Sequence, residues 1–281
     1  SIWLALSMPD APKFVVVPLA IIVGALAGAL AAAIPGVLRA FFGTSEVIVT
    51  IMMNYVILYV ANHIVNHVMS PDLMSNKGVT KAVGLNASLR EPWLTNLFGG
   101  SRVNMGFILA LVFLVVVWFL MKRTTLGFEI RSVGMNPFAS EYAGMSSKRT
   151  IVISMVISGA LSGLGGVVYG LGTFMNYFVQ GTSLSIGFDG MAVSLLGNGG
   201  SIGILLSALL FSILKLGGQG MQFSGIPSEL ANSVIPLIIF FVAINYIVRV
   251  GLAKIMGGKK EVDVVQEVES APNDEKQEGG K

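Results

Sequence analysis

Long apolar runs separated by short polar loops make up most of the chain. Crossing a hydrocarbon core of ~30 Å takes about 20 helical residues at ~1.5 Å of rise each. The run at 14–34 contains no charged residue and is followed by Pro35-Gly36, which is expected to end it. Runs of this length predict membrane-spanning helices. The five full spans are expected at about 14–34, 47–68, 105–121, 151–171 and 230–250.

A different pattern lies between the fourth and fifth of these spans. Residues 186–197 and 202–216 are apolar but short, and Asn198-Gly199-Gly200 separates them. Irregular backbone at membrane depth is tolerated only where protein covers it or where it lines a cavity. The sequence therefore predicts an all-α polytopic transmembrane helix bundle with broken helices over residues 1–256.

Composition supports a membrane protein. Hydrophobic residues make up 54% of the 281 residues and charged residues only 12%, whereas soluble domains carry about 25% charged residues. Soluble domains and nucleic-acid binding are excluded on this ground. The chain contains no cysteine, so no thiolate metal site or cysteine nucleophile is available. Residues 257–281 are polar and acidic, and we expect a disordered cytoplasmic tail there.

The distribution of Lys and Arg predicts the orientation in the membrane. The loop 122–150 carries five basic residues against two acidic ones, and further basic residues follow the last span. Both regions are expected to be cytoplasmic in the plasma membrane, with the C-terminus inside. Ser1 then lies outside. Because an outside start has neither a signal nor an initiator Met, we expect a fragment that lacks its first spans.

Small residues recur every three or four positions on two of the expected spans. They occupy positions 24, 28, 32 and 36 on the first span and 159, 163, 166 and 170 on the fourth. Such spacing lets helix backbones approach closely in lipid. We interpret both rows as packing within the bundle rather than as a contact between chains.

The sequence offers little chemistry for an enzyme. It has no Walker-type phosphate loop, so any ATP and Mg must bind another chain. His63 and His67 share a helical face but lack the Glu of a zinc protease and a third ligand. Asp189 is the only acid in an apolar segment at membrane depth, and it could pair with Lys215 across the Asn-Gly-Gly break. Neither an embedded enzyme nor a bound cofactor is expected.

The basic loop contains a short helix of its own. Asn136 can cap a helix that has Pro137 in its first turn, and Gly144 can end it. Phe138 and Tyr142 then lie on one face at positions i and i+4. An exposed aromatic face on such a helix needs a protein partner or the lipid headgroups.

Here a family resemblance becomes specific. The pattern Gly-x3-Arg-x2-Gly-x-Asn-Pro-x-Ala-x2-Tyr-Ala-Gly resembles the coupling loop of ABC importer permeases of the branched-chain amino acid, simple-sugar and nucleoside type. Similar matches are Glu46-Val-Ile-Val-Thr-Ile-Met-Met-Asn54-Tyr55, the segment Gly187-Phe-Asp-Gly-Met-Ala-Val-Ser-Leu-Leu-Gly197, and Gly217-Gly218 followed by Gly225-Ile-Pro-Ser-Glu-Leu. Together they cover most of residues 14–250.

The resemblance implies a permease subunit that imports a nucleoside or simple sugar. Its implied partners are a cytoplasmic ABC ATPase, a second permease chain in a homo- or heterodimer, an extracellular solute-binding lipoprotein and membrane lipid. The implied ATPase-coupling residues are Gly127, Arg131, Gly134, Asn136, Pro137, Phe138, Ala139, Tyr142 and Gly144.

Polar residues in or near the spans are candidates for the translocation path, because they can bind ribose hydroxyls or base edges. An ion-coupled carrier or a facilitator for a small polar solute remains the alternative, although ion coupling usually needs more buried ionisable groups. The path candidates are Asn54, Asn176, Asp189 and Asn198.

Overall fold

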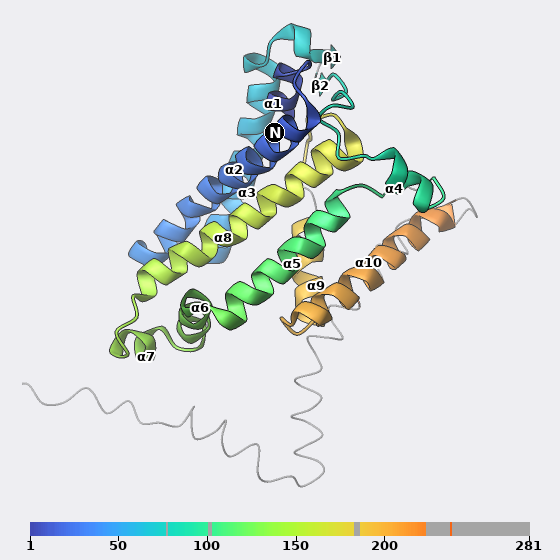
Figure 1. Cartoon of the computed structure of the whole chain (residues 1–281). Coiled ribbons are helices and arrows are strands. Elements are labelled where there is room, and N and C mark those ends of the chain that lie inside the picture. The colour runs from blue at the N-terminus through green and yellow to red at the C-terminus, as the bar shows by residue number, and fades with distance from the viewer. Residues whose placement is uncertain (77, 101–102, 183–185, 223–236, 238–281) are drawn as a thin grey trace, which may run out of the picture. The chain divides into compact units, whose positions relative to one another are not determined.

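A computed structural model describes residues 1–76, 78–100, 103–182, 186–222 and 237 (Figure 1). The chain forms two compact units, residues 1–183 and 184–281. The expected span at 230–250 and the expected tail at 257–281 lie outside the described residues, apart from Leu237.

Four long apolar helices build the first unit. Their bounds are α2 (Lys13–Phe42), α3 (Glu46–His63, continued by a π-helical turn at Ile64–Val68), α5 (Gly106–Arg123) and α8 (Ser147–Val167, continued by a π-helical turn at Val168–Phe174). The spans expected at 14–34, 47–68, 105–121 and 151–171 lie on these helices. Shorter helices are α1 (Ile2–Ser7), α4 (Pro92–Leu97), α6 (Thr125–Met135) and α7 (Pro137–Tyr142).

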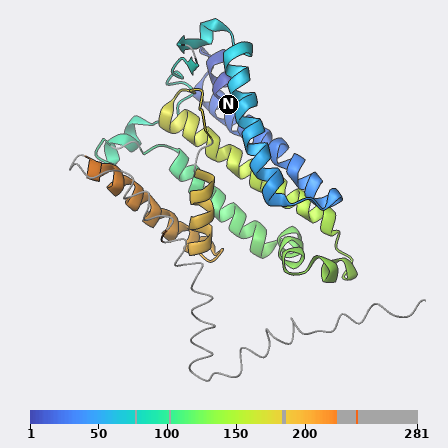
Figure 2. The same ribbon diagram turned by 180° about the vertical axis from the view of Figure 1, so that it is seen from behind.

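The helices of the first unit place two different layers at its two ends (Figures 1 and 2). At one end, α6 and α7 connect α5 to α8. At the other end, the segment between α3 and α5 contains a 3₁₀ turn (Pro71–Leu73) and an antiparallel pair of short strands, β1 (Met74–Asn76) and β2 (Val79–Thr80). This second layer packs on α1 and on the π-helical turn after α8. Its core residues are Ala5, Val16, Ala20, Val83, Ala87, Leu89, Val167 and Leu171.

Helices α2 and α8 are in close backbone contact. A Cβ at Gly28 would lie 2.2 Å from the Gly159 carbonyl oxygen, and one at Gly163 would lie 2.1 Å from the Gly24 carbonyl oxygen. Only glycine permits this approach, so the interpretation of these rows as packing within the bundle is confirmed here. Gly166 does not take part, because nothing lies within 4 Å of its Cβ position.

The expected end of the first span at Pro35-Gly36 is wrong. Helix α2 continues through Pro35 and ends at Gly43, whose φ of +63° and N–H···O bond of 3.2 Å to the Arg39 carbonyl close it. Pro35 and Gly36 are buried, and a Cβ at Gly36 would lie 3.0 Å from the Met155 Cβ. Packing against α8 therefore offsets the hydrogen bond that the proline removes.

The second unit contains a helical hairpin. Its helices are α9 (Ile186–Leu196) and α10 (Ser201–Gln222), joined by a turn in which Asn198 and Gly199 have φ of +50° and +64°. The expected break is thus present, but the expected end of the second segment at 216 is wrong. Helix α10 has 22 residues, because two glycines at ~1 kcal/mol each are too weak to end an apolar helix.

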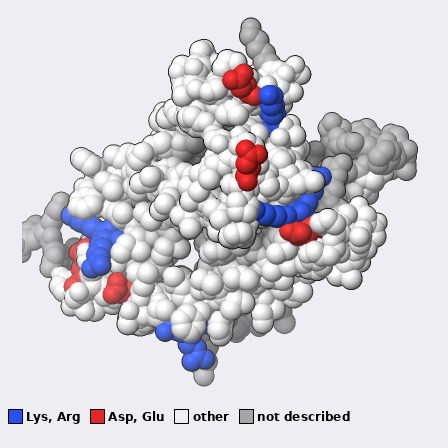
Figure 3. Space-filling model, turned by 45° about the horizontal axis from the view of Figure 1, so that its top comes forward, with Lys and Arg blue, Asp and Glu red and all other residues white. Residues whose placement is uncertain are grey.

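Five described helices are long and apolar enough to cross a membrane: 13–42, 46–68, 106–123, 147–174 and 201–218. Their apolar side chains are mostly exposed in the isolated chain. On the face drawn in Figure 3, uncharged surface predominates over Lys, Arg, Asp and Glu. Such a surface suits lipid or further membrane helices rather than water.

Candidate functional site

The turn from α5 into α6 depends on a threonine cap and a glycine contact. The Thr124 hydroxyl accepts a hydrogen bond from the Gly127 N–H at 3.1 Å and donates one to the Leu120 carbonyl at 2.6 Å. A Cβ at Gly127 would lie 2.1 Å from that same Leu120 oxygen. Gly127 therefore allows α6 to start directly against the last turn of α5.

The next helix is capped as the sequence indicates. The Asn136 side-chain oxygen accepts a hydrogen bond from the Ala139 N–H at 3.1 Å, and Pro137 occupies the first helical position. Gly144 has φ of +83° after the helix, a conformation that L-residues rarely adopt. The prediction of a short helix from Asn136 to Gly144 is confirmed as α7, whereas α6 before it was not predicted.

Helix α7 is also tied to the helix that follows it. The buried Ser147 hydroxyl, in the first turn of α8, donates a hydrogen bond of 2.8 Å to the Pro137 carbonyl. The buried Ser140 hydroxyl donates to the Asn136 carbonyl at 2.9 Å. The inner side of α7 is thus fixed to α8 by a bond between their first residues.

The outer side of α6 and α7 is apolar and open. Phe138 is 76% exposed, Tyr142 95% and Met135 86%. Phe128 on α6 is 57% exposed. We call these four residues the apolar tip. A cluster of exposed aromatic and Met side chains on two consecutive short helices is a surface that could bind in a groove of another protein.

The nine residues expected to couple to an ATPase thus have different local roles. Gly127, Asn136, Pro137 and Gly144 shape the backbone, and Phe138 and Tyr142 form surface. Arg131 bonds the Gly127 carbonyl through its Nε at 3.3 Å, which stabilises α6. Gly134 and Ala139 are exposed, and nothing lies within 4 Å of a Cβ position at Gly134.

The opposite end of the first unit carries a pinned polar segment after α8. Asn62, on α3, donates to the Gln180 carbonyl at 2.8 Å and accepts from the Gln180 N–H at 3.3 Å and the Tyr177 hydroxyl at 3.2 Å. Burial raises the pKa of Tyr177, so its hydroxyl stays a donor. Asn62, which the sequence ranks below the four path candidates, therefore fixes α3 to this segment.

Two of the path candidates lie in this unit. Asn176 is half-buried between Met175, which has φ of +60°, and the pinned Tyr177. Among the residues that the structure describes, its amide has no hydrogen-bond partner. Asn54 is exposed in the middle of α3. Met175, next to Asn176, is a non-glycine residue in the left-handed region and directly follows a π-helical turn. Such a conformation is often found in functional segments.

The other two path candidates lie in the α9–α10 hairpin. The Asp189 carboxylate is paired with the Lys215 ammonium. Asn198 is exposed and supplies the first left-handed residue of the turn, a conformation that asparagine tolerates well. Both side chains therefore have a structural role that is sufficient to explain their residue type.

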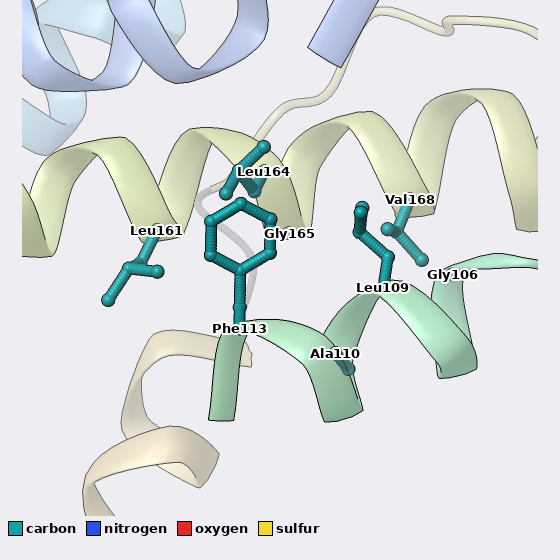
Figure 4. A pocket seen from close by; sticks show the side chains of 8 residues that line it. All are labelled: Gly106, Leu109, Ala110, Phe113, Leu161, Leu164, Gly165 and Val168. Atoms are coloured by element: carbon teal, nitrogen blue, oxygen red, sulfur yellow. The ribbon is translucent and has the colours of Figure 1, made fainter. Parts of the chain in front are cut away.

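Two further features do not form a solute site. A cavity of about 220 Å³ lies between α5 and α8 (Figure 4), but its lining of apolar side chains and glycines offers no polar side chain for hydroxyls. The rings of His63 and His67 stack at a centroid distance of 4.5 Å. Within the described ranges, no group of three or more His, Cys, Asp or Glu could hold a metal ion.

Apolar helices, a broken hairpin and a capped helix pair between two spans together define a polytopic α-helical membrane protein. The family model for the permease component of branched-chain amino acid transport systems matches residues 2–244, and the chain belongs to this family. It is thus an ABC transporter permease, a multi-pass and non-catalytic transport subunit. Permeases of this class work with an ATPase and a solute-binding protein.

Several curated proteins are similar to the chain. The nucleoside ABC transporter permease protein NupB of Lactococcus lactis is 48% identical over 90% of this chain and 70% of its own length. The guanosine ABC transporter permease protein NupP of Bacillus subtilis is 43% identical over 91% of this chain and 72% of its own length. The glucose ABC transporter permease protein TsgB13 of Haloferax volcanii is 27% identical over 89% of this chain and 68% of its own length. No solved structure matches the chain.

Proposed function

We propose that this permease imports nucleosides across the plasma membrane. The observation that carries the proposal is its identity of 48% and 43% to permeases named for nucleoside and guanosine transport, against 27% to one named for glucose. At such identity over most of the chain, a shared substrate class is the simplest inference. A simple sugar is the second candidate, supported by the glucose permease.

The apolar tip is the proposed docking surface for a cytoplasmic ABC ATPase. Phe138 and Tyr142 would enter a groove of that partner. The other coupling residues would shape the α6–α7 segment or let the partner approach its backbone closely: Gly127, Arg131, Gly134, Asn136, Pro137, Ala139 and Gly144. The ATP and Mg belong to the partner chain. The bond from Ser147 to the Pro137 carbonyl supports this role, because it links α7 to a membrane helix.

This role fixes the orientation of the chain. The α6–α7 end is cytoplasmic, and the layer of α1, β1 and β2 is extracellular. An extracellular solute-binding lipoprotein would deliver the solute there, and a second permease chain, identical or different, would complete the pathway. The C-terminus lies in the cytoplasm. Basic residues near α6–α7, including Lys122, Arg123 and Lys148, agree with this side.

The proposed solute path uses amide and carboxylate groups, since a nucleoside presents hydroxyls and base edges. Asn54, Asn176, Asp189 and Asn198 are the candidates. Asn176 has the best support of the four, because its amide is half-buried and available next to a left-handed residue.

Uptake with and without the ATPase tests the proposal. Cells that contain the permease, the ATPase and the binding protein should accumulate radiolabelled nucleosides, and an ATPase variant that cannot hydrolyse ATP should abolish accumulation. Radiolabelled monosaccharides serve as the comparison. Uptake of sugar alone would replace the substrate class. Uptake that survives without the ATPase, or that collapses with the proton or sodium gradient, would contradict an ATP-driven importer.

A further inference from the structure

The α9–α10 hairpin is closed at its turn by a backbone contact. A Cβ at Gly203 would lie 2.2 Å from the Gly197 carbonyl oxygen, so the first turn of α10 touches the end of α9 directly. Beyond the turn, Ala192 of α9 and Phe211 of α10 are buried in one small cluster. Backbone and core therefore fix the near half of the hairpin.

An ion pair holds the far half. Asp189 lies in the first turn of α9, and its carboxylate accepts a hydrogen bond from the ammonium group of Lys215. Lys215 stands in an apolar stretch of α10 that is long enough to cross a membrane. A single charge at such a depth is costly, whereas a pair of opposite charges is much less so. Each residue thus supplies the partner that the other needs.

Helix α9 needs an external support because of its length. Its 11 residues extend only about 16 Å, which is too short to cross the hydrocarbon core. A short helix at membrane depth keeps its position only through contacts with protein. In the second unit, the described contacts of α9 are with α10.

We propose that Asp189 and Lys215 form an intramembrane clamp that makes α9, the 197–200 turn and α10 move as one body during transport. The two are positioning residues in this role, because they act through the helices; for Asp189 the clamp replaces the solute contact proposed above. The transport part of the proposal rests on the proposed function. The clamp and direct solute binding by Asp189 predict opposite results. A covalent linker between α9 and α10 can replace a clamp, but it cannot replace a carboxylate that binds the solute.

A reversible covalent link tests the clamp in the complete importer. The 281 residues contain no cysteine, so Asp189→Cys with Lys215→Cys gives one thiol on each helix. This double variant should lose most nucleoside uptake, by more than about tenfold, because the ion pair is gone. Joining the thiols with a short bismethanethiosulfonate linker should restore uptake, and reducing the linker should remove it again.

Linking is measured independently of transport. Cyanogen bromide cleaves after Met191 and Met221, so residues 176–191 and 192–221 separate unless the linker joins them. As the matched control, Asp189→Cys with Ile213→Cys places the second thiol on an exposed position two residues away. This control pair should link far less. Equal linking of both pairs, or none, would overturn the clamp geometry.

Charge variants give a second measurement. Asp189→Asn and Lys215→Met should each lower uptake at a normal amount of assembled importer, and Asp189→Lys with Lys215→Asp should recover at least part of it. Ser212→Ala is the control on α10, because the Ser212 hydroxyl donates to the Ala208 carbonyl of its own helix; it should transport normally.

The outcomes separate the alternatives. If neither the exchanged charges nor the covalent link restores uptake, Asp189 acts on the solute itself and the clamp is wrong. If the linked hairpin blocks uptake that the unlinked variant retains, α9 and α10 move against each other and the clamp is wrong. If wild-type importer takes up no nucleoside at all, the proposed function fails, while the fragment pattern still decides whether the helices are held together.

Discussion

At the residue scale, the apolar tip separates folding from binding unusually well. Tyr142 is 95% exposed, so its ring contributes little to the fold of α7. The residues that do hold α7, Asn136 and Ser147, act through side-chain hydrogen bonds to main-chain groups. A change at Tyr142 therefore tests the surface without disturbing the helix under it.

We expect Tyr142→Ala to leave the chain in the membrane in normal amount and to reduce both ATPase co-purification and uptake by about tenfold or more. The reason is the loss of a central aromatic anchor, which at protein interfaces is worth about 2 kcal/mol or more. Immunoblotting of membranes, co-purification from detergent and uptake measure the three properties.

The matched control for this prediction is Phe42→Ala. Phe42 is an exposed aromatic residue at the end of α2, outside α6 and α7. It should retain the ATPase and transport normally. A Tyr142→Ala importer that keeps its ATPase and its uptake would remove the tip as the docking surface.

Residue types explain how much of this site the sequence could reveal. Asn136-Pro137 and Gly144 carry local signals for a cap, a first turn and a left-handed end, so α7 could be predicted. Helix α6 was not predicted, because its start lies directly against the preceding helix, where Gly127 approaches Leu120. The structural role of Asn62 could not be predicted for a similar reason, since its partners Tyr177 and Gln180 are more than 100 residues away.

At the element scale, the α2–α8 contact leaves no room for a larger side chain at its glycines. Helix packing in lipid depends on close approach rather than on burial from water. The contact runs along a face of glycines, where the backbone of one helix touches that of the other. A single methyl group there must separate two membrane helices.

We expect Gly28→Ala to destabilise the chain by about 1–3 kcal/mol, because its new Cβ would lie 2.2 Å from the Gly159 carbonyl oxygen. A lower Tm of the detergent-purified chain is the measurement. Gly166→Ala, on α8 but in open space, should leave the Tm unchanged or raise it. Equal effects of both variants would contradict the packing.

Helix ends in this protein were predictable only where local chemistry sets them. The hairpin break at Asn198-Gly199 was predicted because left-handed residues are visible in the sequence. The expected stop at Pro35 failed because α8 compensates for the missing hydrogen bond, and the expected stop at 216 failed because two glycines cost less than an apolar environment returns. A tertiary contact decided the first case, and the small cost of the two glycines decided the second.

At the scale of the whole molecule, the arrangement of two layers at opposite ends of the first unit makes a topological prediction. The α6–α7 end should face the cytoplasm and the β1–β2 end the outside. In the cysteine-free chain, single thiols report their side directly. Ser75→Cys, in β1, and Ser146→Cys, before α8, are both exposed positions.

We expect a membrane-impermeant maleimide added to intact cells to label Ser75→Cys fully and Ser146→Cys only after the cells are opened. The reason is the excess of basic residues around α6–α7, which favours the inside. Labelling measured by a gel shift decides the orientation. The reverse pattern would place the apolar tip outside, where no ATPase can reach it.

The bond between Ser147 and the Pro137 carbonyl has a mechanical consequence. A load applied to α7 enters the first turn of α8 without passing through a flexible linker. Along α8 it reaches the glycines where α2 touches backbone to backbone, and no compliant side chain lies between them at Gly28 and Gly159. A displacement of α7 is therefore expected to move α8 and α2 together, because a hydrogen bond and a backbone contact connect the three helices.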